Sequence, residues 1–238
     1  MSLRRRIRDI LSPVPQPALP PDPLERFRGV PSKLLADFDI LAHGQGLLGT
    51  MTSGLPMDPT GNPIPWFTYP AIEYLNQFDV REKKVFEYGC GQSTAYWRRR
   101  GAQVWGVEHD RAWFEKMSAE TAADRTIYFA DTERNYAAAI ERPGTNFDIV
   151  IIDGVFREAC VEPALAHLRS GGFIILDNAE RDVEVGQLLR QRGLFSVDFN
   201  GFGPINDYTW TTSLFLTREG ITGFDVAAPN PIGGHSAR

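Results

Sequence analysis

Short apolar runs alternate with helix-like patterns along most of the chain. The runs that predict strands are 85–88, 103–107, 126–129, 147–152 and 173–176. The stretches that predict helices are 93–100, the residues after Asp110, 133–140, the surroundings of 161–168, and 182–192. Nearly continuous apolar runs suit parallel strands that are covered on both faces. The pattern therefore predicts a doubly wound, mostly parallel α/β sheet.

The last two strand patterns, 195–199 and 209–216, follow each other with no helix between them. This arrangement predicts an antiparallel hairpin added to the edge of the sheet, which brings the sheet to seven strands. The tail after Arg218 is rich in glycine and proline, so we expect residues 221–238 to form a flexible tail.

Local signals place several helix ends. Ser93 and Asp110 are expected to cap helices, and Gly101 is expected to end the first of them. Val161, Ala164, Leu165 and Leu168 keep helical spacing, with Pro163 near the start of that helix. The spacing predicts helix through Leu168.

Proline separates the first part of the chain from the rest, because twelve of the 17 prolines lie before Ala71. Residues 1–70 are therefore interpreted as an N-terminal arm and cap, with one helix over 32–48 capped by Ser32. Residues 71–220 form the predicted α/β domain. The arm could reach a neighbouring subunit, so the sequence does not decide between a monomer and a homo-oligomer.

Charge and composition limit the possible partners. The net charge of -5 argues against nucleic acid, since only the first residues are clustered and basic. No apolar run is long enough for a membrane span, and the basic start has no apolar segment of a signal peptide behind it. We expect a cytoplasmic protein without stable membrane insertion, in which Cys90 and Cys160 stay reduced.

The sharpest motif runs from Glu87 through Gly89 and Gly91 to Ser93, between a strand and a helix. Glycines there let the backbone approach a ligand, and a helix start offers free amide donors. A nucleotide-like cofactor is held in this way at the carboxyl ends of parallel strands. A tight turn between two core elements is the other interpretation.

The next two strand ends carry acidic residues. Glu108 could accept both hydroxyls of a ribose, and His109 beside it could touch an adenine. Asp131 could accept the adenine amino group or cap the following helix. A nicotinamide dehydrogenase would have a third glycine at position 94, where this chain has Thr94.

As a set, the glycine turn, the Glu108 strand end and the final hairpin resemble the class I S-adenosylmethionine-dependent methyltransferases, over residues 80–218. The resemblance implies a Rossmann-like methyltransferase fold with S-adenosylmethionine as cofactor. It also implies that Gly89 and Gly91 line the methionine part and that Glu108 holds the ribose.

A second group of polar residues follows two later strands: Asp153 after one, and Asp177 with Asn178 after the next. Three oxygen ligands suit Mg²⁺, Mn²⁺ or Ca²⁺. This pattern resembles the metal-dependent O-methyltransferases of the catechol and macrocin types, which implies a divalent cation held by these residues. Alternatively, Asp153 is a bare general base, and Asp177 with Asn178 forms a turn. The catechol-type lysine is replaced by Phe156, and Arg157 is expected to be a surface charge.

Aromatic residues flank the predicted site. Trp66 and Tyr69 could close over a sulfonium, whose charge is attracted to aromatic faces, or could dock the arm. Tyr208 and Trp210 could stack on the acceptor or pack the hairpin. The string at 63–70, with the glycine motif after it, is similar to little-characterised bacterial methyltransferases associated with surface polysaccharide or secondary metabolism.

These features predict methyl transfer from S-adenosylmethionine to a hydroxyl of a small molecule or saccharide, assisted by the metal and with Asp153 as the catalytic group. A metal-independent N- or O-methyltransferase and a non-catalytic binding protein on the same scaffold remain as alternatives.

Overall fold

The computed structural model describes residues 29, 31–120 and 126–234. The chain divides into two units, residues 1–38 and 39–238, which are described separately. The first unit contributes most of helix α2 (Ser32–Asp39), in which no residue is buried. The basic start and most of the proline-rich stretch lie outside the described residues.

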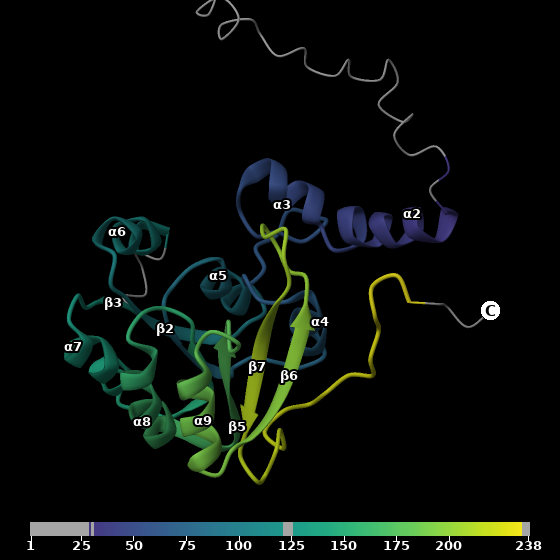
Figure 1. The fold of residues 1–238 in the computed structure, drawn as a ribbon. Coiled ribbons are helices and arrows are strands. Elements are labelled where there is room, and N and C mark those ends of the chain that lie inside the picture. The colour runs from purple at the N-terminus through teal and green to yellow at the C-terminus, as the bar shows by residue number, and fades with distance from the viewer. Residues whose placement is uncertain (1–28, 30, 121–125, 235–238) are drawn as a thin grey trace, which may run out of the picture. The chain divides into compact units, whose positions relative to one another are not determined.

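The second unit holds the sheet and the helices around it (Figure 1). Its strands are β1 (Lys84–Tyr88), β2 (Gln103–Glu108), β3 (Ile127–Phe129), β4 (Phe147–Ile152), β5 (Leu168–Asp177), β6 (Phe195–Gly201) and β7 (Trp210–Leu216). Its helices are η2 (Ile40–Gly44), α3 (Leu47–Ser53), α4 (Tyr69–Asn76), α5 (Gln92–Arg99), α6 (Arg111–Glu120), α7 (Glu133–Ala137), η3 (Ala138–Glu141), α8 (Arg157–His167) and α9 (Val183–Gln191). No helix in the described part of the chain has the length and apolar character that crossing a bilayer requires.

The strands form one seven-stranded sheet in the order β3-β2-β1-β4-β5-β7-β6. The first five strands pair in parallel, whereas β7 runs antiparallel to both β5 and β6. The doubly wound sheet with a C-terminal antiparallel hairpin is therefore confirmed. The chain builds outward from β1 in one direction and from β4 in the other, so the crevice between these two strands is the expected ligand position.

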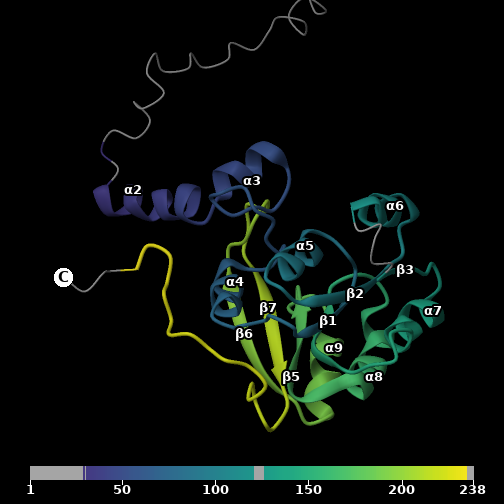
Figure 2. The same cartoon turned by 180° about the vertical axis from the view of Figure 1, so that it is seen from behind.

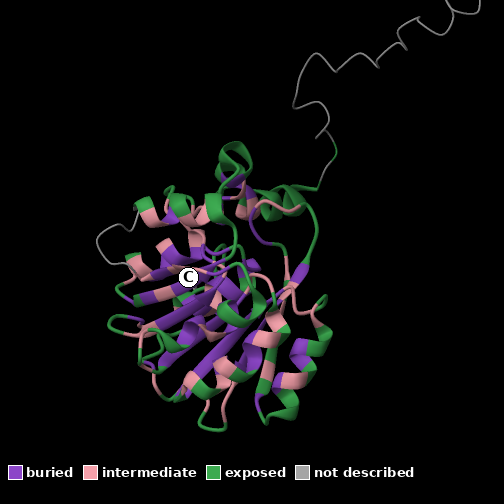
Figure 3. Ribbon diagram, turned by 90° about the vertical axis from the view of Figure 1, so that its left-hand side faces the viewer, coloured by how far each residue is buried: buried purple, intermediate pink, exposed green. Residues whose placement is uncertain are grey.

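Helices cover both faces of this sheet (Figure 2). Along β4, Val150 and Ile152 pack in one cluster with residues of α8 and α9, while Ile149 and Ile151 pack in another with residues of α4 and α5. All residues of β4 are buried. The central strands of the sheet are drawn mostly in purple, the colour of buried residues (Figure 3). Alternate side chains thus enter opposite cores, which explains why the strand has no polar face.

Several expected boundaries are wrong. The single helix over 32–48 is interrupted: α2 passes into the π-helical turn η2, and α3 starts only at Leu47. Ser93 is not a cap, because Gly91 holds the N-cap position of α5. Helix α8 begins at Arg157, so Pro163 lies inside it. Leu168 pairs with Phe147 as the first residue of β5, and this sheet pairing overrides its helical spacing.

Two segments of irregular sequence are well packed. Helix α4, which the pattern did not predict, starts with Pro70 in its first turn and buries Leu75. Part of the expected flexible tail contacts the domain: Asp79 N donates to Asp225 O, and Ala227 N donates to Gln77 O. Residues 235–238 lie outside the described part.

Candidate functional site

The β1–α5 turn packs against the β4–α8 turn at the centre of the sheet. Gly89 has φ +95°, and a Cβ there would lie 2.7 Å from Gly154 Cα. Its N–H donates to Val107 O at 2.9 Å. Gly89 is therefore required both by its left-handed backbone and by the close approach of a neighbouring turn.

Gly91 in the same turn has a different reason to be glycine. Its φ is -172°, which any residue can adopt, and a Cβ there would meet no atom within 4 Å. Gly91 instead lines a cavity of about 420 Å³. The other lining residues are Gly54, Leu55, Pro56, Trp66, Gly89, Cys90, Gln92, Ser93, Trp113, Asp153, Gly154 and Ile205. The missing side chain leaves this cavity open to a ligand.

Glu87 lies fully buried beneath the turn. Thr94 Oγ1 donates to Glu87 Oε2 and accepts from Gly91 N at 3.1 Å, so the two side chains brace the turn. Glu87 Oε1 has no hydrogen-bond partner among the described residues. Burial raises the pKa of Glu87 to about 7. Glu87 thus stabilises the glycine turn through Thr94 and does not itself line the cavity.

Glu108 ties the end of β2 to the glycine turn. Its Oε2 accepts from Cys90 N at 3.2 Å, and its Oε1 accepts from His109 N at 2.7 Å and Asp110 N at 2.8 Å. His109 Nδ1 lies 2.9 Å from Glu108 Oε1. Asp110 Oδ1 accepts from Trp113 N at 2.8 Å, which confirms Asp110 as a helix cap.

Besides Glu87 and Glu108, three further predicted cofactor residues do not line the cavity. Asp131 is exposed, and Thr132 rather than Asp131 holds the N-cap position of α7. Tyr69 is buried at the start of α4, where burial raises its pKa to about 12. His109 contacts Glu108 outside the cavity. Their proposed contacts with a cofactor stay predictions.

A second cavity, of about 290 Å³, lies over the ends of β4 and β5. It is lined by Trp66, Asp153, Asp177, Asn178, Arg181, Asn206 and Tyr208. Trp66 and Asp153 also line the first cavity, so the two cavities meet at these residues. The sequence prediction that Asp153, Asp177 and Asn178 converge is confirmed.

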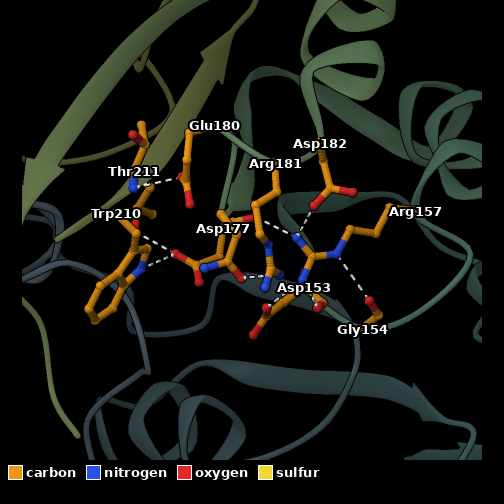
Figure 4. Close-up of polar contacts among 11 residues, drawn as sticks. Asp153, Gly154, Arg157, Asp177, Glu180, Arg181, Asp182, Trp210 and Thr211 are labelled. Atoms are coloured by element: carbon orange, nitrogen blue, oxygen red, sulfur yellow. Dashed lines mark hydrogen bonds and ion pairs between the residues drawn. The ribbon is translucent and has the colours of Figure 1, made fainter. Parts of the chain in front are cut away.

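In each of these three residues the Oδ1 atom already accepts from a protein donor, and Figure 4 shows these contacts for Asp153 and Asp177. Asp177 Oδ1 accepts from Trp210 Nε1 at 3.1 Å and Thr212 Oγ1 at 2.6 Å. Asn178 Oδ1 accepts from Arg181 at 2.9 Å, and Asp153 Oδ1 accepts from Arg157 at 3.2 Å. With two arginines beside them, these residues do not fit a divalent cation in this arrangement. Within residues 29, 31–120 and 126–234, no group of three or more His, Cys, Asp and Glu residues could hold a metal ion.

Arg157 is not the surface charge that the sequence suggested, because its side chain is only 10% exposed. Its guanidinium donates to the carbonyl oxygens of Asp153, Gly154 and Asp177 and to the carboxylates of Asp153 and Asp182. These five acceptors match the five N–H donors of arginine. In the sequence, the only indication that Arg157 would contact Asp153 was its position four residues after it.

The two carboxyl groups at the strand ends influence each other. Burial raises the pKa of Asp153, although Arg157 and Arg181 oppose the rise. Burial and the nearby Asp153 raise the pKa of Asp177 well above its ordinary value. Asp153 therefore lies at the cavity junction as a stronger base than an exposed carboxylate.

The aromatic residues that were expected to flank the site separate into two groups. Trp66 and Tyr208 are 45% and 56% exposed and line the second cavity. Trp210 is buried and holds Asp177 instead, with its ring 6.1 Å from that of Tyr208. Ile205 and Asn178 at the cavities have positive φ values of +72° and +52°, a strain that is often found at functional sites.

Solved structures with a similar fold are distant. The precorrin-6y C5,15-methyltransferase from Geobacter metallireducens GS-15 is 11% identical with a TM-score of 0.49, over 62% of this chain and 86% of that chain. The O-methyltransferase TomG from Streptomyces achromogenes, in complex with SAM, is 17% identical with a TM-score of 0.47, over 62% and 76%. The precorrin 8w decarboxylase from Methanobacterium thermoautotrophicum is 15% identical with a TM-score of 0.45, over 68% and 96%. No family model and no curated protein matches the chain. Likenesses this distant assign no activity.

Proposed function

We propose that this chain is an S-adenosylmethionine-dependent methyltransferase that acts on a hydroxyl of a small molecule or saccharide. The observation that carries the proposal is the junction of two cavities at Trp66 and Asp153. One cavity adjoins the glycine turn expected to hold the cofactor, and the other is lined by polar and aromatic side chains. A group-transfer enzyme needs a donor and an acceptor that meet in this way.

The residues around the first cavity fit the cofactor. The open space at Gly91 admits the methionine part. The Glu108 carboxylate does not line the cavity but accepts from the N–H of the lining residue Cys90, and we propose that its remaining acceptor capacity binds the ribose. Trp66 presents an aromatic face at the junction, which suits a sulfonium. When bound, S-adenosylmethionine supplies an activated methyl group and leaves as S-adenosylhomocysteine.

Asp153 would accept the proton of the acceptor hydroxyl as the oxygen forms its bond to the methyl carbon and the sulfur–carbon bond breaks. Its raised pKa supports this role, since a general base works best with a pKa near the operating pH. Arg157 holds the Asp153 carboxylate and its main-chain carbonyl in place.

We further propose the metal-independent alternative, because protein donors already engage Asp153, Asp177 and Asn178. Electron paramagnetic resonance of Mn²⁺, titrated into protein saturated with S-adenosylhomocysteine, tests this. We expect the free Mn²⁺ signal to remain. A bound Mn²⁺ that Asp153→Asn releases would restore the metal-assisted mechanism.

Calorimetric titration with S-adenosylhomocysteine tests the cofactor. We expect binding at one site with a Kd of about 1–100 µM and no binding of NAD. Folded protein that takes up neither compound would contradict an S-adenosylmethionine enzyme and favour a non-catalytic role.

Two glycine variants separate ligand contact from folding. Gly91→Ala should weaken S-adenosylhomocysteine binding about tenfold, because its methyl group enters the cavity. The free energy of unfolding should change by less than about 0.5 kcal/mol, because the Cβ meets no protein atom. Gly89→Ala should instead lower the free energy of unfolding by about 1–3 kcal/mol. Urea denaturation measures the stability of each variant, and calorimetry measures its affinity for S-adenosylhomocysteine. Equal losses of stability and of affinity in the two variants would contradict separate roles for Gly91 and Gly89.

A further inference from the structure

Arg181 lies in the second cavity with most of its donors unused. The residue is exposed, and it lies between the end of β5 and the start of α9. Among the described residues, its guanidinium makes one hydrogen bond, to Asn178 Oδ1 at 2.9 Å. Arginine carries five N–H donors, and those of the nearby Arg157 all have acceptors. Arg181 therefore retains donors for a ligand.

The acidic neighbours of Arg181 in the sequence do not neutralise it. Glu180 accepts from Thr211 N at 2.9 Å, and Asp182 pairs with Arg157 at 2.8 Å (Figure 4). Arg181 has no ion pair within the described part of the chain, although it is near enough to Asp153 to oppose the rise in the pKa of that carboxyl. The Arg181 guanidinium is thus positioned at the cavity by the Asn178 amide, and no carboxylate of the described residues is bonded to it.

Two aromatic side chains line the same cavity and stay accessible. Trp66 and Tyr208 are each about half exposed, whereas Trp210 beside them is buried against Asp177. Accessible aromatic faces in a cavity suit a ring or another flat apolar surface. The cavity therefore combines ring-binding faces, an unpaired guanidinium and the carboxylate of Asp153.

We propose that the acceptor is a hydroxylated ring compound with an anionic oxygen group, and that Arg181 binds this group. The anion lies at Arg181, the ring packs on Trp66 and Tyr208, and the hydroxyl faces Asp153, where the two cavities meet. Arginine recognises a carboxylate through paired, charge-assisted hydrogen bonds. This assignment rests on the proposed methyltransferase function, because only that function requires the hydroxyl at Asp153.

The test compares two probes of similar size, 4-hydroxybenzoate and the neutral 4-hydroxybenzyl alcohol, by ligand-observed NMR titration on protein saturated with S-adenosylhomocysteine. Wild-type protein should bind 4-hydroxybenzoate about tenfold more tightly than the alcohol. Arg181→Gln should abolish that preference, and Arg181→Lys should keep part of it. Arg192→Gln is the matched control, because Arg192 pairs with the exposed Glu162 and lines neither cavity.

A preference for the anion that disappears only in Arg181→Gln supports the assignment. Equal binding of the two probes, no binding of either, or a preference that survives in Arg181→Gln would overturn it. Failure of the proposed function is distinguishable, because it appears as absent S-adenosylhomocysteine binding in the wild type. In that case the same probes, titrated without S-adenosylhomocysteine, still report whether Arg181 forms an anion site.

Discussion

Arg157 joins three segments that are separate in the sequence. It bonds to the ends of β4 and β5 and to Asp182, the N-cap residue of α9. A buried guanidinium is stable only when its donors are satisfied, and here all five have acceptors. Arg157 therefore supports the strand ends from which Asp153 and Asp177 project, and it acts through them rather than on a ligand.

Replacing Arg157 should consequently destabilise the fold. Arg157→Met should lower the free energy of unfolding by about 2–4 kcal/mol, because it leaves three main-chain carbonyl oxygens and two partly buried carboxylates without their donors. Arg192→Met, which breaks an exposed pair with Glu162, should cost less than about 1 kcal/mol. Urea denaturation of the two variants measures the difference. Similar losses would show that the Arg157 contacts contribute little.

Glu87 should make stability depend on pH. Its pKa rises from an ordinary 4.5 to about 7 on folding, so between these values the folded state keeps a proton that the unfolded state has lost. The contribution of Glu87 to stability is then lost as pH rises through about 7. Glu87→Gln has no such proton, so its free energy of unfolding relative to wild type should rise by up to about 3 kcal/mol between about pH 5 and pH 8. Urea denaturation of both proteins at the two pH values measures this. A difference in the free energy of unfolding between Glu87→Gln and wild type that is the same at both pH values would refute it.

At the scale of elements, α4 and the C-terminal segment complete one of the two cores. Helix α4 contributes Ile72 and Leu75 to the cluster that contains β1 and β5 residues, and Phe224 joins the same cluster. The Phe224 ring lies 5.4 Å from that of Phe78 and 5.3 Å from that of Phe173. Segments outside the repeating strand–helix pattern thus close the core on this face of the sheet.

Phe224→Ala should therefore lower the free energy of unfolding by about 3 kcal/mol, as expected for the loss of a buried aromatic side chain. Val226→Ala is the control, because Val226 is 43% exposed and its replacement should cost less than about 1 kcal/mol. Thermal and urea denaturation compare the two. A neutral Phe224→Ala would mean that the tail is loosely attached, as its composition suggests.

At the scale of the whole molecule, the net charge of -5 opposes binding to a phosphate backbone. Fluorescence anisotropy with a labelled single-stranded RNA at about 150 mM salt should show no complex with a Kd below about 100 µM. Tight binding that weakens steeply as salt rises would contradict this expectation and point to a basic surface.

The sequence by itself determined the parts that depend on local pattern: the parallel strands, the final hairpin, the glycine turn and the acidic residues at successive strand ends. These could be predicted because the period of apolar positions and the conformational range of glycine act within a few residues. Only the tertiary structure decided which other side chains bind to these residues. In the structure Trp210 binds Asp177, Arg157 is buried, and Arg181 has no ion pair among the described residues. Each of these outcomes depends on contacts between residues that are far apart in the chain, or on competition among neighbouring charges.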